Sequence, residues 1–447
     1  MIGARSGADR TAAAGFPDRA EIEARQLASI RALISALIPH NRYYTHKLNE
    51  AGLSPDLSSL NDFTAAMPFT TKQELSEDHR LNPPFGSNLT YPLERYTRFS
   101  QTSGTSGIPL RWLDTTESWG WMVGNWVEVL RASGVGPQDR IFFAFSFGPF
   151  LGFWTAFEAG VRQGCLCLPG GGMSSAARIQ SILVNDVTVL CCTPTYAIRL
   201  GEVAQAEGIC LAESKVKTIL VAGEPGAGIP ATRARIERLW RGARLWDHHG
   251  MTEVGPVTFE CPVRRGVLHV IESAFIPEVI DPETGATVGP GERGELVLTN
   301  LGRIGSPLLR YRTGDLVQRA NASQCACGRY DLAVEGGILG RTDDMVIIRG
   351  VNVYASAVEQ IVRGFDQIAE YRVEISIEQA LPEIALLVET VPDCANAGSV
   401  VHDVEAAMRT ALNLRVPVAL APPGSLPRFE LKAKRWVRMG NGPQPKG

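Results

Sequence analysis

The chain has 447 residues, of which 45% are hydrophobic, so it is long enough for two or three domains and can bury a large core. Its net charge of −3 gives no electrostatic reason to expect nucleic acid or an anionic membrane as a partner. The sequence has no uninterrupted apolar run as long as a membrane span, and its nine cysteines, without a secretion signal, are typical of cytoplasmic thiols or metal ligands.

The N-terminal part of the chain predicts a tail followed by helices. Residues 1–20 are small and polar and contain no apolar signal-peptide core, so we expect a flexible tail and a cytoplasmic protein. Apolar residues recur at helical spacing over 21–37, which predicts a helix. The tract 41–96 is rich in Pro, Asn and Ser and predicts short helices and loops, and a Trp-rich helix is predicted at 115–132.

From residue 140 onward, predicted strands and helices alternate. Short apolar runs favour buried strands, and longer segments with helical spacing favour helices. The strands are predicted at 140–145, 165–168, 188–192, 216–222 and 243–246, and the helices at 151–162, 196–206 and 231–240. This alternation is typical of a mainly parallel sheet with helices on its faces.

The pattern changes after residue 260, where short strands are separated by turn-forming segments such as Asp-Pro-Glu-Thr-Gly. Strands are predicted at 268–271, 274–280, 295–298, 345–348, 371–377 and 384–388, with helices at 355–363 and 401–412. We therefore predict an α/β fold in four parts. These parts are the flexible tail 1–20, an N-terminal domain 21–340 with a β-rich part at about 260–335, a small α+β domain 341–439, and a flexible tail 440–447.

A loop rich in small polar residues occupies 100–109, with the sequence Ser-Gln-Thr-Ser-Gly-Thr-Ser-Gly-Ile-Pro. Glycine lets the backbone approach a ligand closely, and hydroxyl and N–H groups can donate to phosphate oxygens. No Gly-Lys-Ser/Thr sequence ends the loop, so it is not a Walker motif. By itself the loop fits a surface turn as well as a phosphate site.

Four further polar segments follow in the chain. Ala-Gly-Glu-Pro at 222–225 and Asp-His-His-Gly-Met-Thr-Glu at 247–253 each end a predicted parallel strand. Tyr-Arg-Thr-Gly-Asp at 311–315 and Gly-Arg-Thr-Asp-Asp at 340–344 come later. Because ligands bind at the carboxyl ends of parallel strands in open α/β sheets, the first two segments are well placed to share one site.

These segments, with Leu-Pro-Arg-Phe-Glu-Leu-Lys at 426–432, give the chain a family resemblance. It resembles the adenylate-forming enzymes, the superfamily of acyl-CoA synthetases and peptide-synthetase adenylation domains, and within it the phenylacetate–CoA ligase branch. The resemblance runs from about residue 41 to 436. It matches the family's phosphate loop, its two adenine motifs, its ribose motif, its hinge and its lysine motif, in that order.

The resemblance implies a two-step reaction in which a carboxylate attacks the α-phosphate of ATP and a thiol then displaces AMP. The residues that it implies for catalysis are Lys432, Thr252, Glu253 and Arg341, with Glu253 holding Mg²⁺. Those implied for nucleotide binding are Thr102, Ser103, Gly104, Thr105, Ser106, Gly107, Gly223, Glu224, Pro225, Asp247, His249, Gly250 and Asp315, of which Asp315 accepts the ribose hydroxyls. The small domain is implied to be mobile, with Asp343 at its hinge.

The acyl pocket is predicted from the run Phe-Phe-Ala-Phe-Ser-Phe-Gly-Pro-Phe at 142–150, which ends a strand at the same edge of the sheet. Its counterpart in the family lines the aryl pocket. Aromatic walls with a glycine gap suit a flat ring. We predict a pocket lined by Phe147, Phe150, Gly223 and His248, and we interpret the first two phenylalanines of the run as core.

A second signal comes from cysteine and histidine. Cys261, His269, Cys325 and Cys327 form Cys-x7-His followed, after the ribose motif, by Cys-x-Cys. Three thiolates and one imidazole are a standard closed set of ligands for structural zinc. Some members of the phenylacetate–CoA ligase branch carry zinc at a similar position, so we predict a structural Zn²⁺. The alternative is that these are unrelated residues, since cysteine is often simply buried.

Together these features predict an AMP-forming aryl-acid–CoA ligase that uses ATP, Mg²⁺ and coenzyme A. Three alternatives stay open: transfer of the adenylate to a carrier-protein thiol or an amine, activation of another group such as nitrite for N–N bond formation, and a non-catalytic adenylate binder. The last is favoured by departures from the lysine motif, in which Leu431 replaces the usual Gly and Phe429 a small hydroxyl residue. His249 replaces the usual adenine-stacking Tyr. A homodimer is left open.

Overall fold

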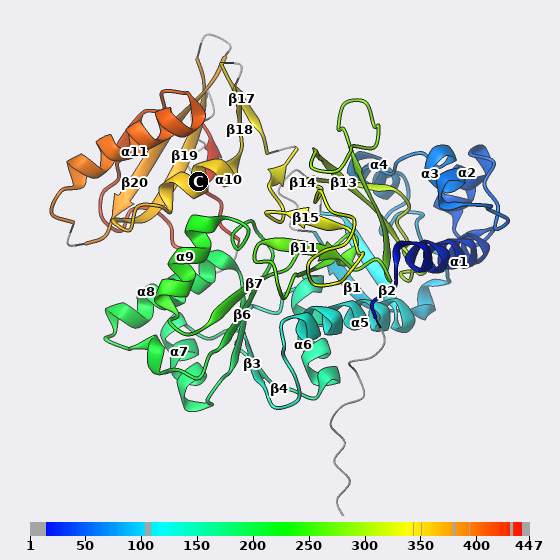
Figure 1. Cartoon of the computed structure of the whole chain (residues 1–447), viewed down its shortest axis with the longest axis horizontal. Helices are drawn as coiled ribbons and strands as arrows, with labels where there is room; N and C mark the ends of the chain where they lie inside the picture. Colours follow the sequence, from blue (N-terminus) through cyan, green and yellow to red (C-terminus); the bar gives the residue numbers. More distant parts are fainter. Residues whose placement is uncertain are drawn as a thin grey trace, which may run out of the picture.

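The structure is a computed structural model. It describes residues 15–102, 109–342, 344–349, 351–378, 381–392, 394–429 and 432–439 (Figure 1). The predicted phosphate-loop residues 103–107, the predicted hinge residue Asp343, Leu431 and the C-terminal tail lie outside the described residues.

The N-terminal part is helical, as predicted. Its helices are α1 (Arg19–Leu37), α2 (Arg42–Glu50), α3 (Leu60–Ala66) and α4 (Lys72–Leu81), followed by the 3₁₀ helix Leu93–Arg95. The side chain of Asp18 accepts a hydrogen bond from the N–H of Glu21 and so caps α1. This cap explains why α1 begins two residues before the predicted start. The buried face of α1, which includes Ile30 and Leu33, packs on α2 and α3.

The predicted parallel sheet is confirmed, with the strand order β4-β3-β5-β6-β7. Its strands are β3 (Arg140–Phe143), β4 (Leu166–Pro169), β5 (Val189–Cys192), β6 (Thr218–Val221) and β7 (Arg244–Asp247). The helices of this part are α5 (Thr116–Ala132), α6 (Leu151–Gln163), α7 (Ser175–Val184), α8 (Pro194–Ala206) and α9 (Pro230–Leu239), with a 3₁₀ helix at Leu211–Glu213. Preceding them, β1 (Tyr96–Gln101) and β2 (Arg111–Thr115) form an antiparallel pair.

The β-rich part contains two antiparallel sheets, ordered β12-β13-β14-β16 and β10-β11-β15, and the small pair β8-β9. Its strands are β8 (Gly250–Met251), β9 (Gly255–Pro256), β10 (Thr258–Glu260), β11 (Val267–Val270), β12 (Phe275–Ile280), β13 (Arg293–Asn300), β14 (Tyr311–Gln318), β15 (Ala333–Glu335) and β16 (Gly340–Arg341). Along β14, buried residues alternate with half-buried ones. This period of two places Asp315 on the buried face of its sheet.

The C-terminal part has a core of its own, built from α10, α11 and the strands between and around them. Its elements are β17 (Val346–Ile348), β18 (Val351–Val353), α10 (Ala355–Val362), β19 (Ile368–Glu378), β20 (Leu381–Thr390), α11 (Ala397–Leu412), β21 (Val418–Leu420) and β22 (Trp436–Arg438). The sheet order is β21-β20-β19-β22. The boundary predicted at 340–344 stays a prediction.

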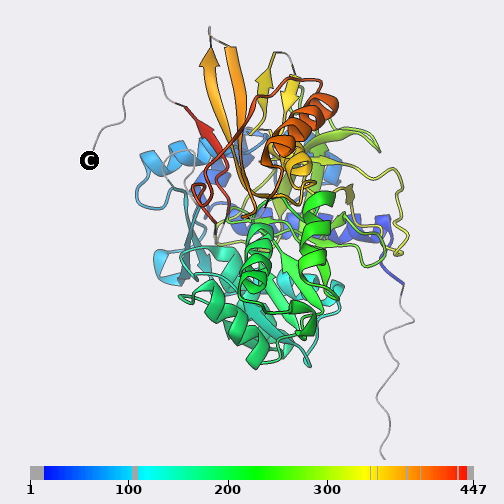
Figure 2. The ribbon, with the colours of Figure 1, turned by 90° about the vertical axis from the view of Figure 1, so that its left-hand side faces the viewer.

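The C-terminal part lies against α9 (Figures 1 and 2). Arg235 donates from Nη1 to the carbonyl oxygen of Ile368 at 2.9 Å, and Arg238 pairs with Asp366. These contacts join α9 to the start of β19 and to the turn before it. Among the described residues, no helix combines the length and the apolar character that crossing a bilayer requires.

Candidate active site

The segment that carries Lys432 lies at the carboxyl edge of the parallel sheet. Glu224, just after β6, accepts a hydrogen bond from the backbone N–H of Ala433 at 2.8 Å. Its other carboxylate oxygen accepts one from the N–H of Thr195 at 2.9 Å. A Cβ atom placed on Gly223 would lie 3.5 Å from Cε of Lys432, so the lysine side chain passes next to this glycine. The lysine motif and the Ala-Gly-Glu-Pro motif therefore meet.

Four charged groups act electrostatically on the Lys432 ammonium. Burial lowers the pKa of Lys432, because it disfavours the charged form, and Arg341 also lowers it. Glu224, Glu253 and Asp315 oppose this shift. The residue nevertheless has a solvent-exposed surface. These charges come from segments that are far apart in the sequence.

Asp315 is buried between two basic side chains. Arg341, its partner on the neighbouring strand β16, lies with Nη1 3.2 Å from Oδ1, and Nε2 of His249 lies 3.1 Å from Oδ2. Burial alone would raise the pKa of Asp315, but His249, Arg341 and Lys432 together hold it below its usual value. The carboxylate is therefore ionised at neutral pH and acts only as a hydrogen-bond acceptor.

His248 is buried and has a defined tautomer. Its Nδ1 lies 2.6 Å from the carbonyl oxygen of Thr258, which can only accept, so Nδ1 carries the proton. Burial and the neighbouring His249 lower the pKa of His248 to about 3, so the ring is neutral at physiological pH. The ring packs on Trp126 of α5 with a centroid distance of 4.2 Å. Next to it, burial and Glu260 raise the pKa of Asp247 to about 6.

The residues predicted to bind the nucleotide have different local environments. The hydroxyl of Thr102, just after β1, accepts a hydrogen bond at 3.0 Å from the N–H of Leu110, just before β2. A Cβ atom on Gly250 would lie 2.9 Å from the carbonyl oxygen of Gly255, so this position has no room for a side chain. Pro225 is exposed.

The predicted acyl-pocket residues belong to two separate aromatic groups. Phe147 contacts Trp154 and Phe157 of α6 with centroid distances of 5.1 and 5.6 Å, whereas His248 packs on α5. Within the described part of the chain, no ring contact joins the two groups. Phe142 and Phe143 are fully buried, as interpreted from the sequence. The pocket itself stays a prediction.

Arg303 is a site residue that the sequence did not reveal. It is fully buried and makes two hydrogen bonds of 2.7 Å to Asp114, at the end of β2. Its Nη1 donates to the carbonyl oxygens of Thr252 and Glu253, both at 2.8 Å. Arg303 thus holds the backbone that carries the predicted magnesium ligand. No motif surrounds it, and only its long-range partners identify it.

Replacing Arg303 with methionine is expected to lower the free energy of unfolding by about 3–5 kcal/mol, because it leaves the buried Asp114 carboxylate without a partner. Urea unfolding followed by circular dichroism measures this change. Arg293→Met is the matched control, since Arg293 is exposed on β13 and its loss should change the stability by no more than about 0.5 kcal/mol. Equal stability of the two variants would contradict the role of Arg303.

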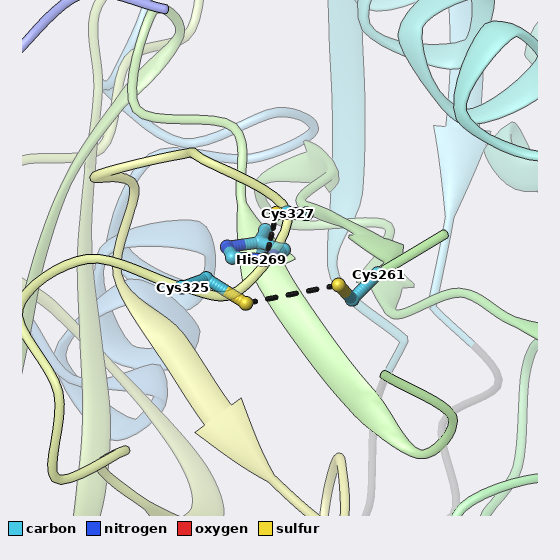
Figure 3. Close-up of side chains that lie close together, drawn as sticks. All are labelled: Cys261, His269, Cys325 and Cys327. Carbon is cyan, nitrogen blue, oxygen red and sulfur yellow. Dashed lines mark hydrogen bonds between the residues drawn. The ribbon is translucent and has the colours of Figure 1, made fainter. Parts of the chain in front are cut away.

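The predicted zinc ligands come together in the β-rich part (Figure 3). Cys261 follows β10, His269 lies on β11, and Cys325 and Cys327 lie in the loop before β15. Their ligand atoms all lie within 4.8 Å of one another. Sγ of Cys261 is 3.7 Å from Sγ of Cys325, and Sγ of Cys327 is 3.4 Å from Nε2 of His269.

Comparison with known proteins agrees with this arrangement. Residues 99–302 match the AMP-binding enzyme family, and residues 350–438 match the AMP-binding enzyme C-terminal domain. The phenylacetate-coenzyme A ligase of Thermus thermophilus is 33% identical over 92% of this chain and 95% of its own length. The phenylacetate-coenzyme A ligase of Escherichia coli is 29% identical over 94% of this chain and 95% of its own length.

Solved structures extend the comparison to the fold. The 2-hydroxyisobutyryl-CoA ligase in the postadenylation state, in complex with R3-HIB-AMP, superimposes with a TM-score of 0.89 at 27% identity, over 98% of this chain and 95% of that one. In complex with 2-HIB-AMP and CoA in the thioesterification state it gives a TM-score of 0.71 at 29% identity, over 95% and 91% of the two chains. The chain therefore belongs to the AMP-binding enzyme family, on the branch of the phenylacetate–CoA ligases.

Proposed function

We propose that this protein is an AMP-forming ligase that activates an aromatic carboxylic acid with ATP and transfers the acyl group to coenzyme A. The observation that carries the proposal is that the Lys432 segment bonds to Glu224 at the carboxyl edge of the parallel sheet, where Glu253, Arg341 and Asp315 also act on the lysine charge. Near full-length similarity to four phenylacetate-coenzyme A ligases supports an aromatic acid as the substrate and coenzyme A as the acyl acceptor.

In the first step the acid's carboxylate attacks the α-phosphate of ATP, pyrophosphate leaves, and an acyl-adenylate forms. Lys432 and Arg341 are the cations that stabilise the negative charge that gathers on the phosphate. Asp315, ionised and buried, is the acceptor for the ribose hydroxyls. Glu253 is the carboxylate for Mg²⁺, which offsets phosphate charge when bound. In the second step the thiol of coenzyme A attacks the acyl carbonyl, and AMP leaves.

A panel of acids tests the function. Phenylacetate, benzoate and their hydroxy and amino derivatives, with 2-hydroxyisobutyrate as an aliphatic comparison, are each supplied with ATP and Mg²⁺, and pyrophosphate release is measured. We expect release with at least one aromatic acid and a thioester with coenzyme A in the mass spectrum. A product only with a carrier protein or an amine would move the proposal to the alternative acceptor. No release with any acid would favour a non-catalytic adenylate binder.

We also propose that the C-terminal part, from 341 onward, rotates between the two steps about Asp343. The higher TM-score to the postadenylation state than to the thioesterification state supports an orientation suited to the first step. Asp343→Pro, which fixes φ near −65°, is expected to leave pyrophosphate exchange near normal. It should slow thioester formation by about tenfold or more, which corresponds to about 1.4 kcal/mol.

Two outcomes would contradict the rotation. An equal fall in both half-reactions would mean that proline has damaged the C-terminal part rather than its hinge. Normal rates in both would mean that no rotation about this residue is needed.

We further propose that Cys261, His269, Cys325 and Cys327 hold a structural Zn²⁺. A tetrahedral site with Zn–S of about 2.3 Å and Zn–N of about 2.1 Å has S···S and S···N edges of about 3.8 and 3.6 Å. The observed distances of 3.7 and 3.4 Å fit these edges. Nδ1 of His269 lies 3.3 Å from the carbonyl oxygen of Asp331, which leaves Nε2 for the metal.

A further inference from the structure

We infer that Glu224 is a positioning residue of the first half-reaction, which ties the Lys432 segment to the N-terminus of α8 instead of binding the nucleotide. This inference rests on the proposed function. The sequence places Glu224 in a motif assigned to the nucleotide. In the structure, however, both of its carboxylate oxygens already accept hydrogen bonds from backbone N–H groups, those of Thr195 and Ala433.

The first of these bonds fixes Glu224 on the N-terminal domain. Thr195 is the second residue of α8, so its N–H is one of the donors that a helix leaves unpaired at its start. A negative charge at this end is also stabilised by the helix dipole. The carboxylate is therefore held in place before the C-terminal part docks, and it offers its second oxygen to Ala433.

A second contact holds the same segment two residues after Ala433. Arg435 is buried and pairs through two nitrogens with Glu370, at 2.7 and 3.1 Å. Its Nη1 donates to the hydroxyl oxygen of Thr195 at 3.3 Å. Thr195 is thus linked to both ends of the segment 433–435. Glu224 bridges it to Ala433, and Arg435 bonds to it directly. Lys432, immediately before this segment, lies next to Gly223, where a Cβ atom would be 3.5 Å from the lysine Cε.

The charge of Glu224 also acts on Lys432. Burial lowers the pKa of Lys432, and Glu224 is the strongest of the opposing charges. The other groups that face the ammonium are Glu253 and Asp315, which also raise this pKa, and Arg341, which lowers it. Loss of the Glu224 charge should therefore lower the pKa of Lys432 further, and the cation should be lost at a lower pH.

The test is Glu224→Gln, which keeps the shape but has one acceptor oxygen for two N–H donors. We expect kcat of acid-dependent pyrophosphate exchange to fall by about tenfold or more, with KM for ATP within about twofold. Thioester formation from synthetic acyl-adenylate and coenzyme A should change much less. The alkaline limb of the exchange profile should move to lower pH. Amide hydrogen exchange of the segment 432–438 should become faster.

Glu207→Gln is the matched control, because Glu207 is exposed at the other end of α8, and it should behave as the wild type. A higher KM for ATP with unchanged kcat would overturn the inference and return Glu224 to the nucleotide site. Equal loss in both half-reactions, or unchanged amide exchange of 432–438, would also overturn it. The proposed function fails separately, if none of the acids supports pyrophosphate exchange by the wild type. In that case the amide-exchange result still decides whether Glu224 holds the segment.

Discussion

Lys432→Ala is expected to lower the rate of acyl-adenylate formation by at least about a hundredfold, the cost of removing one preorganised group that stabilises transition-state charge. The lysine lies beside Gly223 among four charged groups, where its cation can approach the α-phosphate. The fold should be nearly unchanged, because the side chain keeps an exposed surface and leaves no cavity. Acid-dependent pyrophosphate exchange measures the first half-reaction, and isothermal titration measures ATP binding, which should be nearly intact.

Lys434→Ala is the matched control, since Lys434 is an exposed lysine in the same segment. It should exchange pyrophosphate at the wild-type rate. If Lys432→Ala also does so, the assignment of this lysine is wrong. If both variants lose ATP binding, the substitutions have disturbed the segment. A lower rate of Lys432→Ala could then not be assigned to the loss of the lysine charge.

Cys325→Ser is expected to remove the bound metal and to lower the free energy of unfolding by about 4 kcal/mol or more, the range in which loss of a metal site falls. Binding of a structural metal is partly folding energy, because the site is not formed in the unfolded chain. Three of the four ligands are buried, so the remaining ligands would be left unpaired in the protein interior. Metal analysis should find about one zinc per wild-type chain, and chemical unfolding measures the stability.

Cys165→Ser is the control for this experiment, because Cys165 is also buried but lies outside the cluster. Its Sγ contacts the carbonyl oxygen of Gly136 at 3.1 Å, a contact that a serine hydroxyl can also make. It should retain the zinc. Wild-type protein purified without chelators that holds no zinc, and takes up none when it is supplied, would remove the proposal.

The secondary structure followed from local sequence wherever an apolar run was bounded by turn residues. The strand predicted at 188–192 is β5, and the helix predicted at 151–162 is α6, each within one residue at both ends. The helix α7 was missed, because its apolar positions, Ile179 and Ile182 among them, lie between small and polar residues. Tertiary burial, not intrinsic preference, stabilises such a segment.

The convergence of polar segments also followed from the sequence. The residues after β6 and β7 had to reach one edge, because consecutive parallel strands end on the same side of a sheet. His249 and Arg341 both lie next to Asp315. The family resemblance had implied that these three residues belong to one site. The loop residues 103–107 and Asp343 lie outside the described residues, and their roles stay predictions.

By itself, the sequence determined most of the elements, though not α7, and the chemical groups that the family site contains, because helical and strand periodicity and the motifs are local properties. The tertiary structure alone decided how those groups are used. Glu224 bonds to Ala433, 209 residues away, and Arg303 bonds to Asp114, 189 residues away. Such bonds depend on how separately formed elements pack, and no spacing within either segment encodes the partner. Whether a carboxylate within a motif faces a ligand or a backbone N–H is therefore decided only when the domains meet.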